Sequence, residues 1–188
     1  MGTLGVLETI RYGALVLLAL ISGYTDFRYQ KVYNWVNYPA LLLGLLLAAA
    51  QAMTEQNTEL IVSPWTWYFA DALAGAAFCL FVMGTTYLMG GLGFGDVKLM
   101  VAAGALAGFV LSIHILMLSI LTGVAIGVST IIWKGKVREM VRRSFEYRKV
   151  FRRQKLEDSV QLVPFGTAFA GGCLWALAML AVNSYSAG

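Results

Sequence analysis

The chain has 188 residues, of which 59% are hydrophobic and 13% are charged, and its formal net charge is +4. Soluble domains usually carry about 25% charged residues, so this composition excludes an ordinary soluble domain. It predicts an all-α polytopic membrane protein, with residues 1–188 forming a single membrane-embedded domain surrounded by lipid.

Long uncharged runs predict the helices. A helix needs about 20 apolar residues to cross a bilayer. The run Tyr12–Thr25 reaches this length only when Leu4–Ile10 is added, which would leave Glu8 and Arg11 near the water. The run Leu99–Trp133 is too long for one crossing and short for two.

The positions of the charges indicate the sides of the membrane. Ten of the 14 Lys and Arg residues lie in residues 134–155, and Arg28 and Lys31 follow the first run. The segment Thr54–Ser63 has two acidic residues and no Lys or Arg. By the positive-inside bias, the two basic segments are cytoplasmic and Thr54–Ser63 is external.

An even number of crossings must therefore separate the two basic segments, so Leu99–Trp133 is expected to cross twice and to turn near Gly108. Both termini are then expected outside. The six predicted helices cover roughly residues 4–24, 33–53, 65–90, 96–109, 110–133 and 161–183.

The basic segment 134–158 alternates apolar and basic residues. This pattern suits an amphipathic helix lying on anionic lipid at the cytoplasmic surface. A nucleic-acid surface would also be basic. We favour lipid, because the positive-inside bias already requires such a segment, and we expect no nucleic-acid partner.

The sequence gives little support for a metal site or for redox chemistry. Cys79 and Cys173 are the two cysteines, each inside an apolar run, and they form no C-x-x-C pair. His114 has no second ligand at a suitable spacing. We therefore expect neither a metal nor a cofactor.

The stretch "GGLGFGDVKLM", residues 90–100, separates two apolar runs. Its glycines permit positive φ and close backbone approach. Asp96 precedes "VKLM", a position in which it could serve simply as the N-cap of a helix. A second acid, Asp26, is expected at the same membrane face, at the end of the first helix.

Two carboxyl groups held close together share a proton. The ionised one can take a proton from water while the protonated one polarises a carbonyl, which hydrolyses a peptide bond without a metal. The other acid at a helix end, Asp71, is interpreted as a cap or an interfacial residue at the external side.

"GLGFGD" resembles the G-x-G-D motif of aspartic membrane proteases, and "DVKLM" resembles the type IV prepilin peptidases in particular. In that family an Ile-Pro-Asn-like triplet begins six positions after the first aspartate. Here Asp26 is followed at that spacing by Val32, Tyr33 and Asn34. "VPFGTAFAGG", residues 163–172, is similar to the stretch that opens the last helix of the family.

The sequence departs from the family at Tyr33 and at Thr167, where prolines are common. Long members insert a cysteine-bearing domain after the first helix and also methylate the product. Only Phe27–Val32 occupies that place here. The resemblance is therefore to the short, peptidase-only form of tight-adherence (Flp-type) pilus systems, without methyltransferase activity.

The resemblance implies an endopeptidase of the bacterial inner membrane. It would remove the short basic leader of a prepilin or pseudopilin, cleaving after glycine at the cytoplasmic face. Asp26 and Asp96 would be catalytic, and Gly93 and Gly95 would let the loop bring Asp96 inward. Lys98 would either help to keep a carboxylate ionised or extend to the lipid headgroups.

Other readings stay open at this stage. Gln30 and Asn34 could contact the substrate backbone or belong to a solvated link. A small proton-coupled transporter could use membrane acids as a relay, and a non-catalytic scaffold would need neither acid. A presenilin-like protease is the nearest alternative of the same chemical class.

Overall fold

The computed structural model describes residues 3–29, 33–54, 64–90, 92–133 and 165–186. The basic segment 134–158 and Gln30 lie outside the described residues. Within the described ranges the chain is helical and has no strand. The helices are α1 (Thr3–Tyr29), α2 (Asn34–Thr54), α3 (Pro64–Leu88), α4 (Phe94–Ala107), α5 (Phe109–Trp133) and α7 (Phe165–Ser186).

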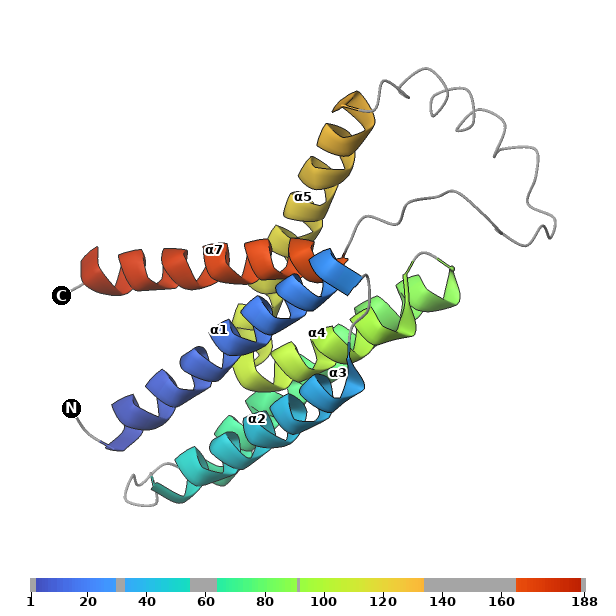
Figure 1. Cartoon of the computed structure of the whole chain (residues 1–188). Helices are drawn as coiled ribbons and strands as arrows, with labels where there is room; N and C mark the ends of the chain where they lie inside the picture. The colour runs from blue at the N-terminus through green and yellow to red at the C-terminus, as the bar shows by residue number, and fades with distance from the viewer. Residues whose placement is uncertain (1–2, 30–32, 55–63, 91, 134–164, 187–188) are drawn as a thin grey trace.

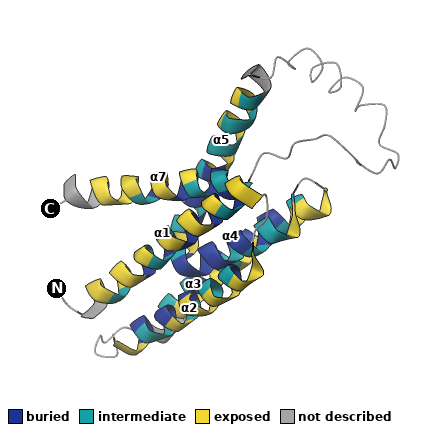
Figure 2. Cartoon of the chain, viewed as in Figure 1, coloured by how far each residue is buried: buried dark blue, intermediate teal, exposed yellow. Residues whose placement is uncertain are grey.

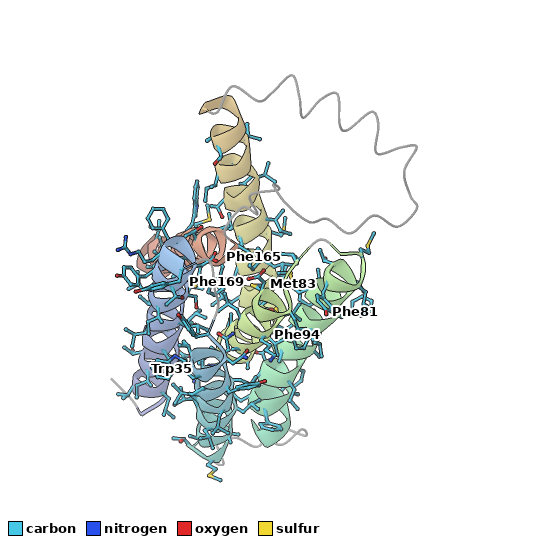
Figure 3. All side chains as sticks on the ribbon, turned by 45° about the vertical axis from the view of Figure 1, so that its right-hand side comes forward. Trp35, Phe81, Met83, Phe94, Phe165 and Phe169 are labelled. Carbon is cyan, nitrogen blue, oxygen red and sulfur yellow. The ribbon has the colours of Figure 1, made fainter. Side chains whose placement is uncertain are left out.

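Five of these helices, all except α4, are long and apolar enough to cross a membrane. Their outward faces carry apolar side chains, with Trp35 75% and Phe81 71% exposed, which suits contact with lipid (Figure 3). The all-helical prediction is confirmed. With 14 residues, α4 is only about 21 Å long at about 1.5 Å per residue, so the prediction of six full crossings stays a prediction.

The helices α1 to α4 run side by side, whereas α5 and α7 cross them at an angle (Figure 1). α4 is the inner helix, and its residues Ala102–Leu106 are all buried (Figure 2). Small residues allow α4 to pack closely against its neighbours. Gly104 of α4 and Gly75 of α3 approach so closely that a methyl group on either would meet the backbone of the other. Close approach through small residues is a common way to pack helices in lipid.

The chain turns between α4 and α5 at Gly108, as predicted. Gly108 has φ 79°, a conformation that favours glycine, and a side chain there would meet the carboxylate of Asp71. Asp71 Oδ1 accepts a hydrogen bond of 2.9 Å from the N–H of Phe109. Asp71 thus caps the first turn of α5 from the neighbouring α3, at the end of α4 opposite to Asp96.

The position of Arg11 differs from the one expected. It was predicted near the water, but it is only 8% exposed. Its Nε donates to the carbonyl of Leu106 (3.0 Å) and its Nη1 to Oε1 of Gln51 (2.8 Å). Because α4 ends before Gly108, its last carbonyl groups have no N–H partner within the helix. Inside a helix bundle such carbonyls need a hydrogen-bond donor from another part of the protein. Burial of Arg11 supplies one.

Candidate active site

Asp26 lies in the last turn of α1 and is 6% exposed. Its Oδ2 accepts two backbone hydrogen bonds, from the N–H of Gly166 (2.6 Å) and from the N–H of Thr167 (3.3 Å). Both donors belong to the first turn of α7, where helical N–H groups have no partner within the helix. The start of α7 therefore forms a binding site for the carboxylate of Asp26.

At this contact there is room only for glycine at position 166. A Cβ at position 166 would lie 2.7 Å from Cβ of Asp26 and 3.0 Å from its Oδ2. A second glycine, Gly23, faces Ala170 equally closely one turn earlier in α1. These small residues allow α1 and α7 to touch, which brings the α7 backbone within hydrogen-bonding distance of Asp26.

Asp96 is the third residue of α4, and this corrects its interpretation as the N-cap. The N-cap is Gly93, because α4 begins at Phe94. Asp96 Oδ2 accepts a hydrogen bond of 3.3 Å from the N–H of Gly93, so the side chain still supports the helix start. It is half-buried at this position.

The glycines before Asp96 differ in backbone conformation. Gly90 has φ 78°, whereas Gly93 is extended, at φ −79° and ψ 149°, and Gly95 lies inside α4. The tight backbone turn thus falls at Gly90. At Gly93, an added Cβ would contact Asp96 Oδ2 at 3.4 Å. The predicted loop-shaping role of Gly93 and Gly95 stays a prediction.

The two carboxyl groups interact electrostatically across 70 positions of sequence. Asp96 lies outside the five spanning helices, and burial raises the pKa of its carboxyl from 3.8 to about 6. The negative charge of Asp26 contributes to the rise, and the hydrogen bond from Gly93 opposes it. A carboxyl with a pKa of about 6 is partly protonated at slightly acidic pH, whereas an ordinary aspartate is fully ionised there. Acid–base hydrolysis by two acids requires one protonated and one ionised carboxyl.

Lys98 extends to α2. Its Nζ donates to Oδ1 of Asn34 (3.2 Å) and lies over the rings of Tyr38 and Phe94, at 5.1 and 4.8 Å from their centres. Asn34 is exposed, and through this bond it contacts α4; its predicted contact with the substrate backbone stays a prediction. The predicted effect of Lys98 on a carboxylate stays a prediction.

Sequence reasoning missed the N–H groups of Gly166 and Thr167. The signal was present, because "PFGT" falls in the stretch that resembles the family's last-helix motif. What it did not reveal was the partner of that stretch, which lies 140 residues earlier in the chain.

No curated protein and no solved structure matches the chain. A comparison with protein families matches residues 13–128 to the type IV leader peptidase family. The matched range is more than half of the chain, and it includes both Asp26 and Asp96. The chain therefore belongs to the type IV leader peptidase family, a family of membrane proteases that act on prepilins.

Proposed function

We propose that this protein is an aspartic endopeptidase of the bacterial inner membrane. It removes the short basic leader from Flp-like prepilins or pseudopilins by cutting after glycine at the cytoplasmic face. The observation that carries the proposal is the placement of two acids at the end of α1 and the start of α4, with Asp26 buried against the first turn of α7 and the charge of Asp26 contributing to the raised pKa of Asp96. Membership of the leader peptidase family supports it.

The surroundings of the two acids suggest their roles. Asp96, whose pKa is raised to about 6, is the acid of the proposed mechanism: in its protonated form it donates a hydrogen bond to the oxygen of the scissile carbonyl. Asp26, whose Oδ2 accepts the two N–H groups of α7, is the base of the proposed mechanism and accepts a proton from water. The water oxygen then attacks the carbonyl carbon.

Collapse of the tetrahedral intermediate breaks the bond between carbon and nitrogen. The proton taken up by Asp26 passes to the leaving amine, which becomes the new N-terminus of the pilin, and the leader departs with a carboxyl group. Asp96 regains its starting state when the oxyanion reforms a carbonyl. No covalent enzyme intermediate is needed.

The proposed topology places both acids at the cytoplasmic side. α4 enters the bundle from that side and α5 leads the chain back to it, so that the basic segments share one face. Single cysteines at positions 30, 93 and 143 should react with a membrane-impermeant thiol reagent only after the cells are opened. A cysteine at position 56 should react in intact spheroplasts. Labelling of position 93 from outside would contradict the proposed site.

The activity is tested with purified protein and a synthetic peptide that has a basic leader, a glycine and an apolar segment. We expect a single cut after the glycine, detected by mass spectrometry. The cut should need no S-adenosylmethionine and should persist in a metal chelator, because two acids supply the chemistry. The new N-terminus should stay unmethylated when S-adenosylmethionine is added. Loss of cleavage in the chelator would contradict the mechanism.

A further inference from the structure

An apolar groove of about 120 Å³ lies between α2, α3 and α4. Its walls include Leu41 of α2, Leu80 of α3 and Val101 of α4. Leu80 is 53% exposed within a helix that can cross a membrane, so the groove opens on a face that contacts lipid. The accessible part of the wall is almost entirely apolar. A cavity of about 150 Å³ in another protein binds benzene, so this groove has room for a short length of an acyl chain.

The side chain of Lys98 lines the groove and places its ammonium group at one end. Nζ lies 5.1 Å from the ring centre of Tyr38 and 4.8 Å from that of Phe94 (Figure 3). It also donates to Oδ1 of Asn34 (3.2 Å). Asn34 and Phe94 are the first residues of α2 and α4, and the apolar wall extends about two turns further into both helices. The cation is therefore at the end of the groove where these two helices begin.

The charge of Lys98 has no acidic partner in the described part of the chain. The described residues provide Nζ with one acceptor, Oδ1 of Asn34, and with no ion pair. An ammonium group can donate more than one hydrogen bond. The faces of the two aromatic rings attract a cation but carry no net charge. An anion with oxygen acceptors would complement this group.

The exposed aromatic residues around Lys98 indicate its depth in the membrane. Trp35 and Tyr38, in the first turns of α2, are 75% and 55% exposed. Trp and Tyr side chains are enriched where lipid headgroups meet the hydrocarbon. The ammonium group beside Tyr38 is thus placed at the depth of the headgroups, and the apolar groove extends from it toward the hydrocarbon. Basic pockets between membrane helices at this depth bind anionic headgroups.

The apolar wall and the cation together discriminate between a lipid and a peptide. An acyl chain has no hydrogen-bonding group, so it fills an apolar groove without leaving a polar group unpaired. An extended peptide would leave its N–H and C=O groups without partners there, which is costly away from water. A single apolar side chain of a peptide would fill the groove but bring no negative charge to Lys98. A phospholipid supplies both the chain and the phosphate oxygens.

We propose that the groove is a binding site for one anionic phospholipid. Nζ of Lys98 donates to the phosphate, and one acyl chain lies against Leu41, Leu80 and Val101. The site lies on the first turns of α4, two positions after Asp96, and it is separate from the two carboxyl groups. The inference goes beyond the proposed function and does not depend on it.

The test measures lipid binding to the purified full chain in a nonionic detergent by native mass spectrometry. Phosphatidylglycerol and phosphatidylcholine with the same acyl chains are compared. Wild type should bind one phosphatidylglycerol about tenfold more tightly than phosphatidylcholine, because a hydrogen bond to a charged group is among the stronger ones. Lys98→Gln should lose this preference, and Lys98→Arg should keep it. Glycerol 3-phosphate, which has the phosphate but no chain, should not compete.

A second pair of variants tests the groove itself. Val101→Phe places a larger side chain in the groove and should weaken the binding of both lipids about tenfold. Val128→Phe is the matched control, because Val128 is 49% exposed on α5 and does not line the groove. It should bind both lipids as wild type does. Unfolding temperatures recorded for all variants show whether each is folded.

Three results would overturn the inference. They are equal affinity of wild type for the two lipids, an unchanged preference in Lys98→Gln, and lipid binding by folded Val101→Phe that equals that of wild type. If Val101→Phe binds lipid normally but raises KM for the synthetic prepilin, the groove receives the substrate instead. Because lipid binding is measured without cleavage, failure of this inference is distinguishable from failure of the proposed function.

Discussion

Replacing Asp96 or Asp26 singly by asparagine is expected to lower the rate of leader cleavage by about 10²–10⁴-fold, the usual contribution of an acid or base catalyst. Asparagine has nearly the same size, and its Oδ1 can still accept a hydrogen bond. The bonds from Gly93 to position 96 and from Gly166 to position 26 can therefore persist. Only the ionisable group is lost.

The measurement is cleavage of the synthetic prepilin by equal amounts of purified wild type and variant, with membrane accumulation and unfolding temperature recorded alongside. Asp71→Asn is the control, because it removes a carboxylate that caps α5 while keeping an acceptor for the N–H of Phe109. It should cleave at the wild-type rate. If Asp96 served only to support the start of α4, Asp96→Asn would be equally active.

Replacing Gly166 by alanine should reduce cleavage by about 100-fold, the cost of misplacing a catalytic group by about 1 Å. The added methyl would lie 2.7 Å from Cβ of Asp26, so either the carboxylate or the start of α7 must shift. Overpacking of this kind also costs roughly 1–3 kcal/mol of stability. The expected result is a folded, slightly less stable protein that binds the prepilin and cuts it slowly.

Gly13→Ala of α1 is the matched control for this substitution, because no atom lies within 4 Å of a Cβ placed there. It should cleave normally and unfold at the same or a slightly higher temperature, since alanine favours a helix more than glycine does. Normal cleavage by Gly166→Ala would contradict the role assigned to the first turn of α7.

Much of the architecture was predictable because hydrophobic runs, glycines and charges act locally along the chain. The helices, the turn at Gly108 and the placement of Asp26 and Asp96 at helix ends followed from such signals. The predicted helix ends differ from the observed ones by several residues at α1, which continues to Tyr29. Nothing in Tyr24–Tyr29 is a helix breaker, and the polar residues there misled the assignment.

The contacts between helices were not predictable in the same way. The pairing of Asp26 with the N–H of Gly166 depends on which helices are neighbours, and sequence spacing carries no such information. The same holds for Arg11, whose burial depends on a free carbonyl of Leu106 on another helix.

The central claim is that Asp26 and Asp96 act as one unit, and the most direct test is a double-mutant comparison. Single-turnover cleavage of one prepilin peptide is measured for wild type, Asp26→Asn, Asp96→Asn and the double variant. Residues that share one catalytic step are not additive, so the double variant should be no slower than the slower single variant. Losses that multiply in the double variant, or a near wild-type rate for either single variant, would contradict the two-acid mechanism.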